Sequence, residues 1–150
     1  MQIQTILSPE RTLCGAPGNS KKRVLENIAH FICKDVKSIN PSDLFGSLIT
    51  RERLGSTGIG HGIAIPHCRI KNCPSIIGGL IKLNHPIDFD AIDNEKVDLL
   101  FVLLVPEQAQ DEHLTVLATL AELFTQSSLR QRLRDCANKD DLYQIAITGN

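Results

Sequence analysis

The sequence lacks an excess of charge of either sign. Its 150 residues contain 16 Lys and Arg against 17 Asp and Glu, a formal net charge of −1. Binding to nucleic acid or to an anionic membrane normally needs a broad field of one sign, so this balance argues against both kinds of partner. The short basic cluster at residues 21–23 precedes helical periodicity, and we interpret it as the solvated start of a helix.

The sequence also lacks paired cysteines, a signal peptide and a long apolar run. Five cysteines, an odd number with no CxxC pair, are typical of a reducing compartment. The N-terminal residues have neither the cationic start nor the apolar stretch of a signal peptide. The longest apolar run, residues 97–106, contains Asp98 and is far too short to span a bilayer. We therefore expect a cytoplasmic protein that does not insert into the membrane.

No internal repeat, low-complexity tract or linker divides the chain. A single domain over residues 1–150 is the simplest organisation, and a chain of this length buries about 70% of the surface that its unfolded form exposes. A sizeable hydrophobic core is therefore available without disulfides.

Five segments carry helical signals. Ser20 is a suitable N-cap for an amphipathic helix over about 20–37, and Asn40-Pro41 starts a second helix that ends near Gly55. Cap and acidic residues at 110–112 start a helix over 111–125, and two more helices are expected over about 127–136 and 140–147.

Three segments carry strand signals, after a lead-in over residues 1–19 that we expect to be extended or irregular. A short strand over 62–66 must end at Pro66, because proline cannot donate to a sheet ladder. Residues 76–83 form a second strand, with a bulge or close backbone approach at Gly78-Gly79. Residues 85–94 are turn-rich, and the apolar run 97–105 indicates a central strand covered on both faces. Together these elements predict an α/β single-domain sandwich with a central mixed β-sheet flanked by helices on both faces.

The segment 49–69 gathers residues suited to one chemistry, a phosphohistidine site with His67 as nucleophile. The accepting imidazole nitrogen must be unprotonated, which a side chain with a pKa near 6.5 allows. Its other nitrogen must be held by an acceptor such as a backbone carbonyl. The incoming phosphoryl group needs converging donors, which Arg51 and the glycine-rich loop can supply. The loop residues that we expect to bind phosphate are Gly55, Ser56, Thr57 and Gly58.

A second histidine, His113, is expected in the first turn of the helix that follows the central strand, at the sheet edge where α/β sites cluster. Ordinary explanations remain open for each residue. His67 could be a plain strand-end histidine, His113 a surface residue, and Arg51 a partner of Glu52. His61 is more often exposed than functional in a glycine loop.

Other chemistries fit the spacing poorly. A P-loop needs Lys-Ser/Thr after its last glycine, but here His61-Gly62 follows. A zinc site built from His61, His67, Cys68 and Cys73 matches no familiar ligand spacing, and adjacent strand residues point to opposite faces. The same geometry disfavours a protease dyad of His67 and Cys68. We therefore expect neither a metal nor another cofactor.

The string Gly-Ser-Thr-Gly-Ile-Gly-His-Gly-Ile-Ala-Ile-Pro-His at 55–67 closely resembles a family signature. It is similar to the active-site motif of fructose/mannitol-type enzyme IIA domains (EIIA type 2) of the bacterial phosphoenolpyruvate-dependent phosphotransferase system (PTS). Segments 20–23, 50–52, 89–94, 97–101 and 103–106 extend the resemblance over essentially the whole chain, especially to the nitrogen-regulatory group.

The resemblance implies a role for each of these residues. His67 would accept a phosphoryl group from a phosphohistidine on a small HPr-like carrier, with Arg51 as the active-site arginine and His113 as the second histidine. Ser56 and Thr57 fall in the adjoining loop. The protein would then control regulatory targets such as kinases or transporters through its phosphorylation state. Leu54 and Ile59 are expected on the docking surface.

The chain departs from the family pattern at two positions. Cys68 stands where glycine is common, and His61 where asparagine is common. A thiol at 68 would lie near the docking surface and could be oxidised, and His61 could perturb the charge around His67. Two alternative functions remain: the IIA component of a fructose/mannitol-type sugar transporter, and a binding module of the same fold that no longer accepts phosphate.

Overall fold

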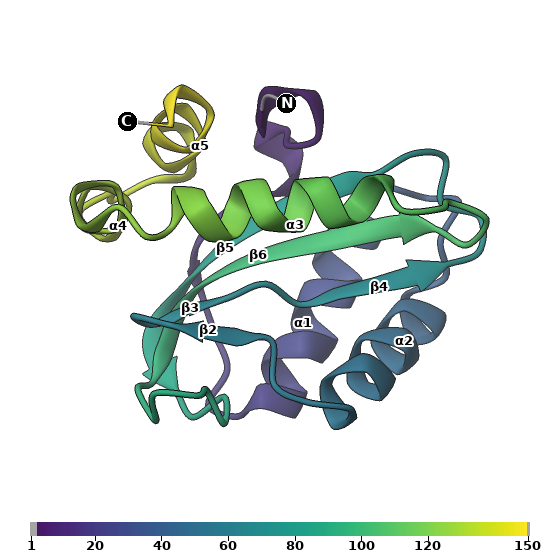
Figure 1. The fold of residues 1–150 in the computed structure, drawn as a ribbon, viewed down its shortest axis with the longest axis horizontal. Coiled ribbons are helices and arrows are strands. Elements are labelled where there is room, and N and C mark those ends of the chain that lie inside the picture. Colours follow the sequence, from purple (N-terminus) through teal and green to yellow (C-terminus); the bar gives the residue numbers. More distant parts are fainter. Residues whose placement is uncertain (1–2, 150) are drawn as a thin grey trace.

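A six-stranded mixed sheet forms the centre of the molecule (Figure 1), as seen in a computed structural model that describes residues 3–149. Two short 3₁₀ helices, η1 (Ile3–Thr5) and η2 (Pro9–Arg11), open the described chain. The remaining elements, in order, are β1 (Thr12–Ala16), α1 (Lys21–Cys33), α2 (Pro41–Arg53), β2 (Gly58–Gly60), β3 (Ile63–Ala64), β4 (His67–Ile70), β5 (Ile77–Ile87), β6 (Val97–Pro106), α3 (Glu112–Leu123), α4 (Ser127–Arg134) and α5 (Lys139–Thr148).

Strand β6 is the hub of the sheet. The strand order is β1-β5-β6-β3-β2, and β4 also pairs with β6. Strands β3 and β4 run parallel to β6, β5 runs antiparallel to it, and β1 runs parallel to β5. The prediction of a mixed sheet in one α/β domain is confirmed.

Alternate residues of β6 point into two separate cores. Leu100, Val102 and Leu104 pack with the apolar faces of α1 and α2. Leu99, Phe101, Leu103 and Val105 pack with α3, α4 and α5 on the opposite side of the sheet. Figure 1 shows α3 lying across one face, with α1 and α2 on the other. Apart from Asp98, which pairs with Arg134, the strand is apolar because helices cover both of its faces.

The expected helix starts have a visible cause. The Ser20 hydroxyl accepts a hydrogen bond from the backbone N–H of Arg23, and the Asn40 side chain accepts from Ser42 and Asp43. These bonds satisfy donors that have no partner within the helix. All five expected helices are present, with ends that differ by a few residues.

The strand predictions need four corrections, one of which is β2 (Gly58–Gly60), a strand inside the segment that the sequence analysis treated as a glycine-rich loop. The chain does leave β3 before Pro66, but it resumes at once as β4, which the sequence analysis missed. Proline lacks a donor but keeps its carbonyl, and Pro66 O accepts from Leu103 N at 2.9 Å, so the chain stays attached to β6. The lead-in contains β1, and β5 continues to Ile87 through part of the region expected to be turns.

The glycine pair in β5 marks a close approach. A Cβ at Gly78 would lie 2.7 Å from the Phe101 ring, and one at Gly79 would lie 3.2 Å from Ile32. The register against β6 is regular at both positions, so the close approach is present without a bulge there. Within residues 3–149, no helix has the length and apolar character needed to cross a membrane.

Candidate active site

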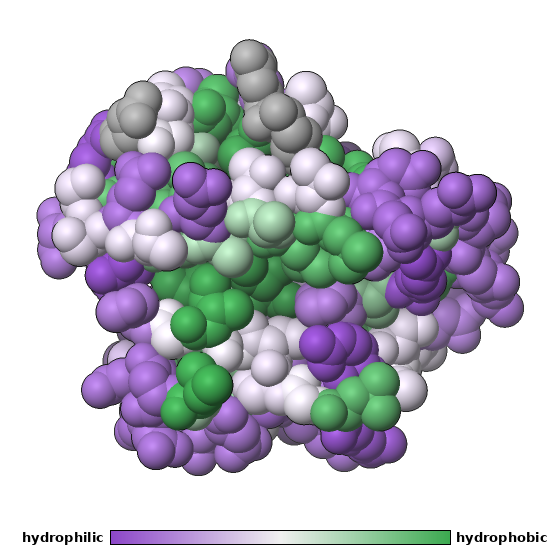
Figure 2. All heavy atoms as spheres, in the orientation of Figure 1, coloured by the Kyte–Doolittle hydropathy of each residue, from purple (hydrophilic) through white to green (hydrophobic). Residues whose placement is uncertain are grey.

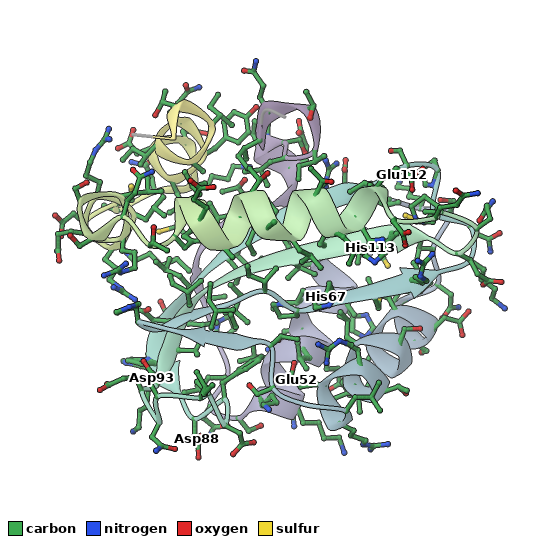
Figure 3. The ribbon with its side chains drawn as sticks, viewed as in Figure 1. Glu52, His67, Asp88, Asp93, Glu112 and His113 are labelled. Atoms are coloured by element: carbon green, nitrogen blue, oxygen red, sulfur yellow. The ribbon has the colours of Figure 1, made fainter. Side chains whose placement is uncertain are left out.

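His67 and His113 face a common groove beside β4. The groove has a volume of about 800 Å³ and lies between α2 and the start of α3. Figure 3 shows His67 on β4 beneath the α3 end that carries His113. We call it the His67 groove; its lining residues are Ser42, Asp43, Gly46, Ser47, Thr50, Arg51, Leu54, His67, Cys68, Arg69, Ile70, Lys71, Val105, Glu107 and His113. The structure thus brings Arg51, His67 and His113 together.

The two ring nitrogens of His67 have different partners. Nδ1 lies 2.7 Å from the carbonyl oxygen of Ile65. Because a carbonyl can only accept, Nδ1 carries the proton in this contact, and Nε2 of the neutral ring keeps its lone pair. Nε2 accepts a hydrogen bond of 3.4 Å from Nε of Arg51. The sequence left the choice of nitrogen open, and in this geometry Nε2 is the ring nitrogen that keeps a lone pair.

The surroundings of His67 favour its neutral form. Burial lowers the pKa of His67 below its usual 6.5, and Arg51 and His113 lower it further by charge repulsion. The hydrogen bond to Ile65 and the carboxylate of Glu52 act in the opposite direction. The net lowering leaves the imidazole unprotonated near neutral pH, as a nucleophile requires.

Arg51 is held from two sides at the end of α2. Its Nη1 donates to the carbonyl oxygen of Gly55 at 2.9 Å, while Nε points at His67. Arg51 therefore does not pair with Glu52, whose carboxylate instead binds Thr57 and Lys21. A guanidinium fixed by the loop carbonyl can keep its place when a negative group enters the groove.

Glu52 is a site residue that the sequence analysis did not single out. It is 7% exposed, and its carboxylate accepts from the backbone and hydroxyl of Thr57 and from Lys21 Nζ at 3.0 Å. The buried carboxylate therefore joins the end of α2, the glycine-rich loop and the start of α1. One acidic residue among 17 gave no sequence signal, because its burial depends on how the loop folds back.

The glycine-rich loop directs its hydroxyls into the fold. Ser56 Oγ donates to Phe89 O at 2.8 Å and accepts from Gly58 N, and Thr57 is committed to Glu52. None of residues 55–58 is among those that line the His67 groove. A direct contact of either hydroxyl with a phosphoryl group would require it to leave its present partner, so the phosphate-binding role of this loop stays a prediction.

His113 projects from the first turn of α3. Its Nδ1 is buried and has no hydrogen-bond partner among the described residues. An unpaired buried nitrogen costs free energy unless a ligand or water completes it. Its place beside His67 suits an anion that enters the groove.

The two departures from the family pattern differ in position: Cys68 follows His67 directly on β4, whereas His61 is not among the residues that line the groove. Cys68 points into the core, and burial raises the pKa of its thiol to about 12. Cys68 is also among the residues that line the groove, as expected, but its burial and raised pKa argue against the oxidation that the sequence suggested. His61 occupies a turn with φ of 58°, where its backbone N–H donates to Asp93 and its carbonyl accepts from Arg134.

The imagined zinc ligands are dispersed. Cys68 faces the core and His67 faces the groove, as expected for neighbours in a strand. Over the described part of the chain, no group of three or more His, Cys, Asp or Glu side chains is arranged to hold a metal ion.

Comparisons with known proteins give a consistent assignment. The family described as "Phosphoenolpyruvate-dependent sugar phosphotransferase system, EIIA 2" matches residues 5–147. A nitrogen regulatory protein of Pseudomonas aeruginosa is 47% identical over 147 residues, which cover 98% of this chain and 96% of that one. The nitrogen regulatory protein of Escherichia coli is 41% identical over 146 residues, which cover 97% of this chain and 89% of that one.

Solved structures agree with the sequence matches. The nitrogen regulatory protein IIA-Ntr of Neisseria meningitidis superposes with a TM-score of 0.89 at 38% identity, covering 96% of this chain and 98% of that one. The mannitol IIA of Escherichia coli, at 18% identity and a TM-score of 0.78, covers 93% of this chain and 98% of its own, and shares the fold. The chain therefore belongs to the EIIA type-2 family of the phosphoenolpyruvate-dependent sugar phosphotransferase system, as a phosphocarrier of the nitrogen-regulatory type.

Proposed function

We propose that His67 accepts a phosphoryl group on Nε2 from a phosphohistidine of a small HPr-like carrier protein. The observation that carries this proposal is the 2.7 Å contact between Nδ1 and the Ile65 carbonyl, which leaves the Nε2 lone pair facing the His67 groove. In the transfer, the N–P bond of the donor breaks as an Nε2–P bond forms. The electron pair of the broken bond returns to the donor imidazole, and the proton on Nδ1 stays in place.

Arg51 and His113 stabilise the transferred group. The Nε–H of Arg51 already points to the place where the phosphorus would bond, so a small shift brings it to a phosphoryl oxygen. Its anchor on Gly55 O limits how far it moves. His113 offers a buried Nδ1 that has no hydrogen-bond partner within residues 3–149, and it donates to the phosphoryl group when protonated there.

The glycine-rich loop contributes to the site chiefly by holding Arg51 and Glu52 in place. Gly55 supplies the carbonyl that anchors Arg51, and Thr57 fixes the carboxylate next to Arg51 in the chain. The phosphoryl group arrives already activated on the donor, so the transfer needs neither a nucleotide nor a metal ion.

Exposed apolar side chains around the groove provide the docking surface for the donor and for regulatory targets. Leu54 at the groove edge is 82% exposed, and Leu114, next to His113, is 54% exposed. Figure 2 shows apolar side chains gathered across the middle of this face, between polar regions. A transient partner can cover such residues and release them. The targets, such as kinases or transporters, would respond to the phosphorylation state of His67. We place the reaction in the cytoplasm, in line with the unpaired cysteines.

Intact mass measured after incubation with phosphoenolpyruvate, enzyme I and an HPr-like carrier tests the proposal. We expect one acid-labile phosphate, absent in His67→Ala and retained in His30→Ala, a variant at an exposed histidine on α1. No gain of mass beside a demonstrably phosphorylated carrier would refute the transfer and favour a binding module. A phosphate on His67 that moves onward to a IIB protein of a sugar permease would identify the sugar-transport alternative.

A further inference from the structure

We infer that Arg69 is a positioning residue, which holds the start of α3 so that His113 faces His67. The inference rests on the function proposed above for His67 and adds a residue that has no part in that chemistry. Arg69 lies two positions after His67 on β4, so both side chains leave the strand on the same face. That face is opposite to the one that Cys68 buries against α1 and α2.

The guanidinium of Arg69 bridges to the connection between β6 and α3. Its Nη1 donates to the carbonyl of Ala109 and its Nη2 donates to the carbonyl of Gln110 at 2.7 Å. Two parallel donors on adjacent carbonyls fix the direction of the segment as well as its distance from β4. His113 follows this segment by only three residues.

The start of α3 has few other restraints of its own. Asp111 occupies the N-cap position but makes no side-chain capping bond. Within the connection, the backbone bonds are Ala109 N to Pro106 O and Leu114 N to Asp111 O, and both are local to the turn. Pro106 pairs with Ile70 of β4 and Ala109 packs on the core, so among the described residues Arg69 provides the side-chain hydrogen bonds that tie Ala109 and Gln110 to β4.

His113 needs such support because its Nδ1 makes no hydrogen bond to the described residues. Nδ1 of His113 is buried and unpaired in the described structure, so no hydrogen bond holds the ring in place. Its direction is set by the backbone of the first turn, which the Arg69 bridge stabilises. A displacement of about 1 Å in a catalytic group is enough to slow a reaction roughly a hundredfold.

A test of Arg69 must distinguish the positioning of His113 from direct effects of charge on His67. The charged and titratable residues of the groove are Asp43, Arg51, Arg69, Lys71, Glu107 and His113, and Glu52 acts from beneath. Loss of Arg69 also removes a positive charge, and a direct charge effect would not depend on His113. A double-mutant cycle with His113 therefore distinguishes the two causes.

The test compares Arg69→Ala, His113→Ala and the double variant, with the exposed Arg132→Ala on α4 as a matched control. Two quantities are measured: the single-turnover rate of phosphorylation at saturating donor, and the pKa of His67 from an NMR titration. We expect Arg69→Ala to lower the rate roughly tenfold or more. Arg69→Lys keeps the charge but offers its donors from a single nitrogen, so its rate should lie in between. Arg69→Ala should also raise the pKa of His67, and so should His113→Ala, because the charge of His113 helps to lower that pKa.

The decisive result is the double variant. If Arg69 acts through His113, Arg69→Ala changes neither quantity further once His113 is absent. An equal loss of rate in both backgrounds overturns the inference, as does an effect confined to the concentration dependence on donor, which would indicate docking. If the parent protein accepts no phosphate, the proposed function fails, and the His67 titration alone still tests the coupling of Arg69 to His113.

Discussion

Thr57 binds both oxygens of the Glu52 carboxylate: its backbone N–H lies 3.0 Å from Oε2 and its hydroxyl lies 2.6 Å from Oε1. Lys21 adds an ion pair of 3.0 Å, and the same lysine lies 3.2 Å from Asp90. The buried carboxylate thus fixes the loop that leads to His67 against two helices. Because Arg51 directly precedes Glu52 on α2, this network also fixes the backbone position from which the Arg51 side chain extends toward His67.

Thr57→Val should lower the free energy of unfolding by about 1–3 kcal/mol, since it leaves one oxygen of a buried carboxylate without its donor. Urea unfolding followed by circular dichroism measures the change. Thr115→Val on the exposed face of α3 is the matched control, and it should change stability by less than about 0.5 kcal/mol. Equal losses in the two variants would show that the Thr57 hydroxyl contributes nothing specific.

The imidazole of His67 should titrate below 6.5, because burial above all disfavours its charged form and lowers its pKa. An NMR pH titration gives the midpoint. Since the neutral ring is the nucleophile, phosphorylation should persist as the pH falls to about 6.5 and decline only below the lowered pKa. A midpoint at or above 6.5 would contradict the burial argument.

The same shift makes stability depend on pH. The folded pKa of His67 is lower than the unfolded one, so the unfolded chain binds more protons as the pH falls through this range. The contribution of His67 to stability is therefore complete above about pH 6.5 and diminishes below it. The free energy of unfolding of His67→Ala should lack this part of the acid dependence, as urea titrations at a series of pH values can measure.

Arg51→Lys should slow phosphorylation by roughly 10²-fold or more, because lysine cannot donate at once to the loop carbonyl and to the phosphoryl group. Rapid-quench measurement with phosphorylated carrier gives the rate. Arg53→Lys, at an exposed position near the same helix end, is the control and should keep the parent rate. A small effect of Arg51→Lys would mean that a single positive charge suffices at this position.

Gly78→Ala and Gly46→Ala should change stability in opposite directions. The added methyl at 78 would lie 2.7 Å from the Phe101 ring inside the core, which we expect to cost about 1–3 kcal/mol. The methyl at 46 would meet no atom within 4 Å and would replace glycine inside α2, a gain of about 1 kcal/mol. Thermal or urea unfolding of both variants tests the packing at β5, and a tolerated Gly78→Ala would contradict it.

The sequence predicted which side chains gather at the groove better than it predicted the groups that hold them in place. The resemblance of residues 55–67 and the matching segments to a family signature singled out Arg51, His67 and His113, and the structure places all three on one groove. The carbonyl of Ile65, which decides the free nitrogen of His67, has no residue-specific signal, because every residue carries one. Ser56 and Thr57 looked like phosphate ligands because of their hydroxyls, yet both hydroxyls are committed to partners that only the folded loop provides.

Periodicity and turn chemistry determined the helices, the central buried strand and the α/β class, since those signals are local and recur along the chain. The sequence analysis did not predict strand β4, because Pro66 lacks a backbone donor and was expected to end the strand. In the structure the Pro66 carbonyl accepts from Leu103 of β6, and β4 pairs with β6 directly after it. Which side chains meet across α2, β4 and α3 was decided by long-range packing alone. The sequence by itself therefore determined the family and predicted His67 as the nucleophile. Only the tertiary structure decided the tautomer of His67, the burial of Glu52 and the hydrogen bonds from Arg69 to the connection between β6 and α3.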